Sequence, residues 1–369
     1  MGRHLLRRKA LAALVALVAL APTLRGEDVP VRVAVPDEPL PPLQGHEGTE
    51  VYSIPIPDED VIGSFVQGYL ASQKAWLQAV LDSSARYRPM ITAALAARGL
   101  PRELEFLPAV ESGFQARAVS PQGATGLWQL MRNTASPYGL RMDLWLDERR
   151  DPARATEASL SKLTENRAYF GDWYLALAAY NCGIGKLAGI RRHSPGDDYW
   201  GLRRKGVLPR ETAAFVPAFL ALSMIFSHPG RYGLVVGWDP PPPEPRTMTL
   251  DRCVDLRILS RAAGIPVADL VTANPALNFL VTPPSSYAYA LKVPAADADA
   301  VEQVLANASM PLLEFRIHVV ARGDTLFAMS LRYGVSVEVI SEFNPHVDPR
   351  FLKIGAQLLI PVLPVRSTQ

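Results

Sequence analysis

Two stretches in the C-terminal third of the chain repeat each other and divide the molecule into parts. Residues 256–275 can be laid over residues 326–345 without a gap, with glycine opposite glycine and Asn-Pro opposite Asn-Pro. Each copy is followed by a short apolar strand that ends in proline, Leu291–Pro294 in the first and Leu358–Pro361 in the second. Each unit therefore indicates the order strand, helix, helix, strand, and we expect two small modules that serve in targeting or binding.

The region ahead of these modules has helical rather than strand periodicity. Apolar residues recur at helical spacing over about residues 60–230, and no convincing strand precedes residue 230. Asp151 and Pro152 predict the capped start of a long helix, and Asp172 predicts the cap of the next one. The proline run at 239–245 is typical of a semi-rigid linker. We therefore expect a mainly α protein, with an all-helical domain followed by small βααβ modules.

Further helices are expected within the helical domain. The apolar positions from Phe65 to Leu81 predict one helix, and those from Met90 to Leu95 predict a second that stops at Gly99. A compact glycine-containing loop at 123–126 is expected to precede a short helix from about Leu127.

The N-terminus has the features of a secretory signal peptide. A basic segment precedes an apolar run, Ala10–Ala21, that is too short to span a bilayer comfortably and ends in a small-residue cleavage pattern. No cysteine follows the run, which excludes lipid attachment there, and an uncleaved membrane anchor is the alternative. The mature protein is expected in the periplasm.

The predicted segments are a signal peptide at 1–25, a proline- and acid-rich lead at 26–60, a helical domain at 61–235 with its core at 95–230, a linker at 236–247, a first module at 248–296 and a second module at 314–363.

Composition narrows the classes of partner and cofactor. The formal net charge of +2 and the lack of a block of like charge argue against a dedicated nucleic-acid binder. Two cysteines and six scattered histidines have no metal-ligand spacing, so no metal or other cofactor is expected. Cys182 and Cys253 allow either one disulfide or two buried thiols, and the sequence leaves both open.

One glutamate interrupts the apolar face of a predicted helix. The segment from Arg102 to Gly113 places Leu104, Leu107 and Glu111 on one stripe, and its glycine predicts the helix end. A carboxylate on a core-facing stripe is costly unless it is paired or protonated, and burial raises the pKa of an acid. Such an acid suits general acid catalysis at neutral pH. The alternative is a glutamate that pairs with an arginine or caps a neighbouring helix.

Three short motifs in this region resemble those of a known enzyme family. They are Glu111-Ser112, Gly126-Leu-Trp-Gln129-Leu-Met131 and Ala178-Ala-Tyr180-Asn181. Their order and spacing resemble the soluble lytic transglycosylase domain, and the match extends over about residues 95–230. The chain is thus similar to the glycosidase family that includes the lytic transglycosylases and the goose-type lysozymes. This resemblance implies a lysozyme-like helical domain.

The resemblance also implies an activity. Family members cut the β-1,4 bond between N-acetylmuramic acid and N-acetylglucosamine in peptidoglycan and leave 1,6-anhydro ends. Glu111 matches the single catalytic acid and base of the family: it would protonate the leaving oxygen and then accept the proton of the muramyl C6 hydroxyl. This differs from the two-carboxylate glycosidase scheme, because a hydroxyl of the substrate replaces an enzymic nucleophile or an activated water.

Five neighbours receive roles by the same resemblance. Ser112 would orient the catalytic carboxyl, Gln129 would hydrogen-bond the substrate, and Met131 would shape the cleft. Tyr180 and Asn181 would contact the sugar near the scissile bond. Outside the family context, the same residue types are ordinary helix caps, surface amides and core side chains.

One position departs from the family pattern. Relatives commonly carry a tyrosine in a Glu-Thr-x-x-Tyr-Val segment, with its hydroxyl near the catalytic carboxyl. Here the segment is Glu211-Thr-Ala-Ala-Phe215-Val216, which lacks that hydroxyl. The departure implies weaker placement of the catalytic proton, and it bears on the rate more than on the reaction.

The second module resembles a LysM domain, whose family binds glycans that contain N-acetylglucosamine. The resemblance runs from His318 to Pro361 and includes a Gly323-Asp-Thr turn, which the first module lacks. The first module therefore resembles a degenerate LysM copy. The implied partners are peptidoglycan glycan strands, and the chain is expected to act as a monomer. The glycan-binding residues implied in the second module are Asp324, Thr325, Leu326, Asn344 and Pro345.

Two other functions stay open at the level of the sequence. A muramidase would cut the same bond with water, and a second opposing carboxylate would favour it, but the sequence does not place Asp143, Asp147 or Glu148. A catalytically silent wall-binding protein is the other alternative. Phe215 favours it, and the retained Glu111 argues against it.

Overall fold

The computed structural model describes residues 52–237, 243–250, 252–283, 287, 289–307, 309–345 and 347–363. The chain divides into two compact units, and the second unit consists of Met142–Asp147 together with the chain from Pro243 onward. The first unit takes the rest of the chain up to Pro242. The predicted signal peptide and most of the predicted lead lie outside the described residues, as do residues 238–242 of the predicted linker.

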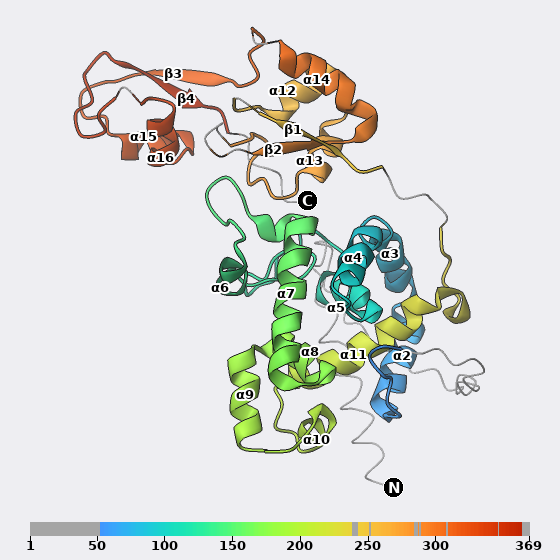
Figure 1. The fold of residues 1–369 in the computed structure, drawn as a ribbon. Coiled ribbons are helices and arrows are strands. Elements are labelled where there is room, and N and C mark those ends of the chain that lie inside the picture. Colours follow the sequence, from blue (N-terminus) through green and yellow to red (C-terminus); the bar gives the residue numbers. More distant parts are fainter. Residues whose placement is uncertain are drawn as a thin grey trace. The chain divides into compact units, whose positions relative to one another are not determined.

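The first unit is built from α-helices and short 3-10 helices (Figure 1). Strand-like pairing among its described residues is limited to isolated bridges, as predicted. Its elements are α2 (Asp60–Ser72), α3 (Lys74–Ser84), α4 (Arg88–Ala97), η1 (Arg102–Phe106), α5 (Leu107–Ser112), α6 (Arg132–Ala135), η2 (Ser136–Tyr138), η3 (Glu148–Arg150), α7 (Pro152–Phe170), α8 (Trp173–Cys182), α9 (Ile184–Arg192), α10 (Tyr199–Arg204), α11 (Arg210–Ser227) and η4 (Pro229–Tyr232).

The predicted helix caps are confirmed. The Asp151 carboxylate accepts hydrogen bonds from the backbone N–H groups of Ala153 at 3.0 Å and Arg154 at 3.1 Å, which satisfies two free donors at the start of α7. The Asp172 carboxylate accepts the backbone N–H of Leu175 at 2.8 Å and starts α8. These local contacts set where the two helices that frame the site begin.

Two predicted helices are wrong in their bounds. The segment from Phe65 to Leu81 forms two helices that break at Gln73, because no residue between Tyr69 and Leu77 is buried and no apolar face stabilises a continuous helix there. No helix begins at Leu127 either. Residues 125–130 form a turn closed by two backbone hydrogen bonds of 3.1 Å, and the next helix is α6.

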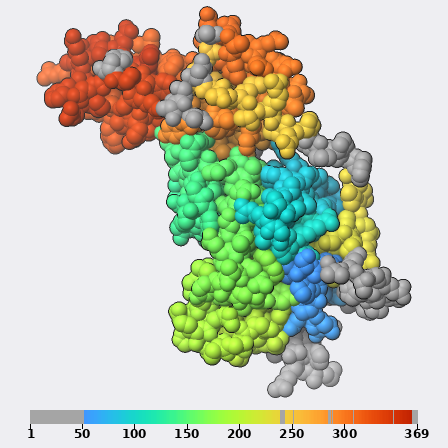
Figure 2. Space-filling model, in the orientation of Figure 1, coloured from blue at the N-terminus to red at the C-terminus, as the bar shows by residue number. Residues whose placement is uncertain are grey.

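The core of the first unit is organised around α11, which packs against α2, α5 and α8. In Figure 2 the blue atoms from the start of this unit and the yellow atoms from its end lie on the same face. By length and composition α11 is the one described helix that could cross a membrane, and 72% of that stretch is buried inside the protein. Such burial is also found in the core helices of globular proteins.

The second unit contains the two predicted βααβ modules. In each module the first and last strands pair antiparallel, and a glycine with positive φ, Gly264 or Gly334, ends the first helix. The mainly α fold class with small βααβ modules is thus confirmed. The elements are β1 (Arg246–Thr249), α12 (Leu256–Ala263), α13 (Val267–Ala273), β2 (Ala290–Val293), η6 (Ala295–Asp297), α14 (Ala298–Ala306), β3 (Phe315–Val319), α15 (Leu326–Tyr333), α16 (Val337–Glu342) and β4 (Gln357–Pro361).

The repeated Asn-Pro pairs have a structural explanation. In both modules the asparagine amide donates to the carbonyl four residues earlier in the second helix, at 2.8 Å for Asn274 and 2.7 Å for Asn344. The same side chain also exchanges two hydrogen bonds with the backbone of the returning strand, at Lys292 in the first module and at Leu359 in the second. Each asparagine therefore ties a helix end to a strand and satisfies buried backbone groups.

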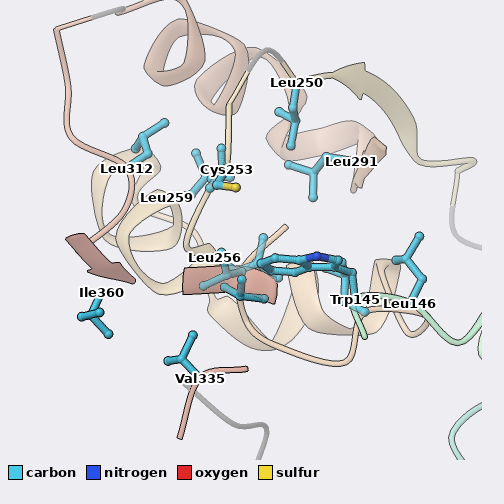
Figure 3. Packing of buried hydrophobic residues seen from close by; sticks show 14 of the residues in the cluster. Trp145, Leu146, Leu250, Cys253, Leu256, Leu259, Leu291, Leu312, Val335 and Ile360 are labelled. Carbon is cyan, nitrogen blue, oxygen red and sulfur yellow. The ribbon is translucent and has the colours of Figure 1, made fainter. Parts of the chain in front are cut away.

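A segment predicted to belong to the helical domain lies in the core of the second unit. Trp145 is only 1% exposed, and its ring lies edge-on to those of Phe279 and Tyr287, as part of the cluster shown in Figure 3. The backbone carbonyl of Trp145 accepts the N–H of Asn278 at 2.8 Å. The backbone N–H of Asp147 donates to the carbonyl of Ala276, two residues before Asn278, at 2.8 Å. Burial of this tryptophan explains why Met142–Asp147 belongs to the second unit.

Candidate active site

Glu111 lies near the end of a short helix whose form differs from the prediction. The single helix expected from Arg102 is instead a 3-10 helix, η1, followed by α5. The change occurs because Pro108 has no N–H to donate to the carbonyl of Leu104, so a regular α-helix cannot continue through that turn. Gly113, with φ of 60°, ends α5 as predicted. The carboxyl of Glu111 thus sits at the last turn before a left-handed reversal of the chain.

Three glutamates lie on this stretch, and they have different partners. Glu105 is paired with Arg88, with 3.1 Å between Oε1 and Nη2. Glu103 accepts the backbone N–H of Ser53 at 2.8 Å. Among the described residues, the carboxyl of Glu111 takes part in no hydrogen bond or ion pair. The alternative in which Glu111 is a structural partner of an arginine therefore finds no support.

The protonation of Glu111 is set by burial and by two charges. Burial raises the pKa of Glu111 to about 8, while the nearby Lys162 lowers that pKa and the charge of Glu211 raises it. The side chain still keeps part of its surface exposed. At neutral pH the carboxyl is therefore mostly protonated and reachable, as a general acid must be.

One loop brings the three sequence motifs together. The hydroxyl of Ser112, next to Glu111, donates to the carbonyl of Leu127 at 2.8 Å. The hydroxyl of Tyr180 donates to the carbonyl of the following residue, Trp128, also at 2.8 Å. The end of α5, the turn at 125–130 and α8 are therefore fixed against each other by buried hydrogen bonds.

The glycine at the start of this loop is required by a close approach of two backbones. Gly126 has φ of 85°, and a Cβ atom there would lie 1.9 Å from the carbonyl oxygen of Arg149. The guanidinium of Arg149 in turn donates to the carbonyls of Gly123 at 2.8 Å and Leu130 at 3.0 Å. The backbone and the side chain of Arg149 both contact the loop, and these contacts hold its polar groups in place.

Two of the predicted site residues, Ser112 and Tyr180, have hydroxyl groups that bind within the protein. Ser112 makes no hydrogen bond to Glu111, because its hydroxyl is used by Leu127 and by the helix carbonyl of Pro108. Tyr180 is 5% exposed and its hydroxyl is also within 3.2 Å of another buried hydroxyl. These two residues build the loop beside Glu111, and their hydroxyls have partners within the protein.

The other three predicted contacts lie closer to solvent. Met131 is 39% exposed. Gln129 has an unusual positive φ of 45°, and its amide donates to the carbonyl of Gly126 at 2.9 Å. The amide of Asn181 donates to Glu211 at 3.0 Å, and its oxygen accepts the hydroxyl of Thr212 at 2.7 Å. Two of the three therefore keep partners inside the protein while their side chains stay partly exposed.

The sequence analysis missed Lys162 as a site residue. Its ammonium group donates to the carbonyl of Tyr180 at 2.7 Å and lies 3.9 Å from the centre of that ring. One signal was available: Lys162 lies on the same face of α7 as Ser159 and Asn166, two polar residues that are almost fully buried. Polar residues at that spacing on a buried face point to a shared polar site.

Phe215, which stands where relatives commonly carry a tyrosine, is a buried aromatic side chain. Phe215 is 5% exposed and lies on α11, the helix that packs against α5. A phenyl ring there adds apolar surface to the core and no hydrogen-bond donor. Burial remains the largest cause of the raised pKa of Glu111.

All three residues considered as an opposing base have partners of their own, Asp147 included. Glu148 accepts the backbone N–H of Arg141 at 2.8 Å and lies 3.5 Å from the guanidinium of Arg154. Asp143 accepts the backbone N–H groups of Trp145 and Leu146 and closes a turn. Both cysteines considered for a disulfide are free thiols.

The predicted glycan-binding residues of the second module fall into two groups. Leu326 and Asn344 are buried, so their side chains serve the fold. Asp324 accepts the backbone N–H of Ala321 at 2.7 Å and lies 2.8 Å from His318, and these contacts lower its pKa. Thr325 caps α15, and both it and Pro345 are exposed. The sequence analysis missed two strongly exposed aromatic side chains of the same module, Phe327 and Phe351.

Comparisons with known proteins agree with this architecture. A family model of the Transglycosylase SLT domain matches residues 88–200, and a model of the LysM domain matches residues 318–361. Membrane-bound lytic murein transglycosylase D of Escherichia coli strain K12 is 32% identical over 324 residues, which cover 83% of this chain and 70% of that protein. A putative tributyltin chloride resistance protein of Alteromonas sp. strain M-1 is 35% identical over 126 residues, 33% of this chain and 58% of that one.

Solved structures show a weaker likeness. The 70 kDa soluble lytic transglycosylase of Escherichia coli superposes with a TM-score of 0.35 and 24% identity, over 45% of this chain and 28% of that one. A score of this size supports no inference about the fold. The sequence match over most of both proteins does establish kinship, and the chain belongs to the family of lytic murein transglycosylases with an SLT domain and a C-terminal LysM domain.

Proposed function

We propose that this protein is a peptidoglycan lytic transglycosylase that cuts the bond between N-acetylmuramic acid and N-acetylglucosamine, with Glu111 as its single acid and base. The observation that carries the proposal is the state of Glu111: it has no partner among the described residues, it is partly exposed, and its pKa is raised to about 8. It also lies at the junction of three motifs shared with the lytic transglycosylases.

The proposed reaction uses one carboxyl twice. The neutral Glu111 gives its proton to the oxygen that leaves with N-acetylglucosamine as the glycosidic bond breaks. The resulting carboxylate then accepts the proton of the muramyl C6 hydroxyl while that oxygen bonds to C1 and closes the anhydro ring. Glu111 ends neutral, and neither water nor a cofactor is consumed. A hydrolase would instead need a base for water, and Asp143 and Glu148 are held in other contacts.

The pH dependence of cleavage tests the protonation of Glu111. Because the acid form must be present before the first step, kcat/KM should fall as pH rises through about 8, where Glu111 loses its proton. Below that pH this group should impose no loss. The measurement is the initial rate on a soluble glycan substrate between pH 5 and 10. A decline centred near pH 4.5, or a constant rate up to pH 10, would contradict the assigned role.

We also propose that the second module, and not the first, holds the enzyme on the glycan. Thr325 and Pro345 are exposed in the second module, whereas the equivalent residues of the first module, Asp255 and Pro275, are buried. The loop that follows Pro275 is also occupied by the segment that carries Trp145. The first module thus has no comparable open surface at these positions.

Point variants test this assignment better than truncation, because Leu312 belongs to the core that both modules share. Replacing Phe327 and Phe351 with alanine should weaken binding to insoluble peptidoglycan about tenfold or more, since exposed aromatic side chains carry much of the energy of such surfaces. Cleavage of short soluble glycans should be unchanged. Ile317→Ala, at a comparably exposed site on β3, is the control. Equal binding by the double variant and the wild type would sink the assignment.

The location of the protein is proposed on the same basis. A relative of this chain is named as membrane-bound, and peptidoglycan lies outside the cytoplasmic membrane. The basic and apolar N-terminal segment would export the chain to that compartment. Fractionation of cells that express the full chain, with N-terminal sequencing of the product, would separate a cleaved periplasmic form from an anchored one.

A further inference from the structure

We propose that Lys162 is a positioning residue for the reaction: its ammonium group, held against the carbonyl of Tyr180, stabilises the negative charge that Glu111 acquires when it protonates the leaving oxygen. The inference rests on the proposed role of Glu111 and adds a group to it. Lys162 would touch neither the substrate nor the reacting atoms. It would act through the carboxylate alone.

The ammonium group of Lys162 makes two contacts with Tyr180. Lys162 reaches from α7 to the last turn of α8, where its Nζ donates to the carbonyl of Tyr180 at 2.7 Å. Carbonyl groups in the last turn of a helix lack partners within the helix and carry partial negative charge, so a cation is favoured there. The Nζ atom also lies 3.9 Å from the centre of the Tyr180 ring, a second interaction that favours the charged form.

The anchor of Lys162 is joined to the backbone next to Glu111. The hydroxyl of Tyr180 donates to the carbonyl of Trp128, and the hydroxyl of Ser112 donates to that of the preceding residue, Leu127, both at 2.8 Å. Ser112 follows Glu111 directly in the chain. Three hydrogen bonds therefore connect the lysine to the residue beside the carboxyl, and all of them lie within the first unit.

The charges around Lys162 and Glu111 show that their interaction differs between the protonated and the ionised form of Glu111. Burial lowers the pKa of Lys162 to about 8, while Glu111 and, less strongly, Cys182 on α8 raise it. Lys162 lowers the pKa of Glu111, whereas Glu211 from α11 raises it. The attraction exists only after Glu111 has given up its proton. It is therefore stronger in the charged intermediate than in the resting enzyme, which is the condition for an interaction to speed a reaction.

Removing the charge of Lys162 should have two linked effects. The pKa of Glu111 should rise further, so the alkaline fall of kcat/KM should move up by about one pH unit. Glu111 would also become a weaker acid, and kcat should fall by up to about tenfold, the limit that a change of one pKa unit sets for the rate of proton transfer. A purely structural role for Lys162 could lower kcat, but it would not shift the alkaline limb.

Three substitutions separate charge from packing. Lys162→Gln keeps a hydrogen-bond donor without the charge, Lys162→Met keeps the length alone, and Lys162→Arg keeps the charge. We expect the alkaline limb to move in the first two variants and to stay near its original pH in the third. Melting curves of the full chain would confirm that each variant is folded. An unmoved limb in both neutral variants, or an equal shift in the arginine variant, would overturn the proposal.

A measurement that needs no turnover distinguishes this inference from the proposed function. The pKa of the Glu111 carboxyl can be followed by carbon-13 NMR in the wild type and the Lys162 variants, with Glu111→Gln for assignment. The coupling is reciprocal, so the pKa of Lys162 should fall in Glu111→Gln even if every Lys162 variant failed to fold. If Glu111→Gln stayed active, the proposed function would fail while the coupling could still be present. If neither pKa value changed in these variants, the proposed coupling between Lys162 and Glu111 would be wrong, whatever the outcome for the proposed function.

Discussion

Replacing Glu111 with glutamine is expected to reduce glycan cleavage by about a thousandfold, because the amide can neither donate the proton nor accept it back. The measurement is mass spectrometry of purified peptidoglycan digested by the wild-type protein and by the variant. Wild-type digests should contain muropeptides one water lighter than the hydrolysis products, and digests with the variant should lack them.

The other outcomes of this experiment separate the remaining functions. Products of full mass with reducing ends would make the protein a muramidase. No products from the wild type would favour a wall-binding protein, with Phe215 as the first position to restore to tyrosine. Products of equal yield from both proteins would exclude Glu111 as the acid.

The substitution Glu111→Gln should also change the stability of the protein, and this change tests whether the carboxyl is buried in its neutral form. The pKa of Glu111 is raised in the folded state, so between its ordinary value and about 8 the folded protein binds more protons than the unfolded one. The contribution of this group to stability is therefore lost as pH rises through that window. Glu111→Gln should raise the melting temperature more at pH 8 than at pH 5. An equal change at both values would mean that the carboxyl is not buried in its neutral form.

Replacing Gly126 with alanine is expected to cause the largest loss of stability of any single methyl group added to the site. The new Cβ would lie 1.9 Å from the carbonyl oxygen of Arg149, and a backbone atom cannot move aside as a flexible side chain can. We expect a loss on the order of 3–5 kcal/mol, with a fall in melting temperature of about 10 °C. Calorimetry of the full chain would measure it.

A matched control is present in the same loop. Gly123 also has a positive φ, 84°, but a Cβ atom there would meet nothing within 4 Å. Gly123→Ala should therefore carry only the cost of the left-handed backbone, about 1–2 kcal/mol. Equal losses in the two variants would show that conformation, and not the contact with Arg149, makes glycine necessary at position 126.

Several features of the fold could be predicted because their causes are local in sequence. A helix cap such as Asp151 acts on N–H groups two and three residues away, so the start of α7 can be predicted from neighbouring residues alone. The Asn-Pro repeat belongs to the same class, since each asparagine bonds within its own module. Pro108, near the start of α5, was also a local signal for the change from η1 to α5, and the prediction of one continuous helix overlooked it.

Other features could not be predicted because they depend on which partner a side chain finds in the folded chain. Ser112 and Tyr180 match the family motifs, but only the structure shows that their hydroxyls bind the backbone of the loop at 127–128. The exposed aromatic side chains of the second module, Phe327 and Phe351, were missed for a related reason. Exposure of Phe327 depends on how its module folds, and periodicity alone does not give it.

The sequence by itself determined the order of the domains, the repeated module and the candidacy of Glu111, because a carboxyl on an apolar stripe needs only helical spacing to be noticed. Only the tertiary structure decided that this carboxyl has no hydrogen-bond or ion-pair partner among the described residues. It also placed the ammonium group of Lys162 on the carbonyl of Tyr180, from where its charge lowers the pKa of Glu111. It also decided that Trp145 completes the core of the second unit, far along the chain from the modules. The physical reason is that the pKa of an acid and the core of a domain depend on contacts between residues distant in sequence.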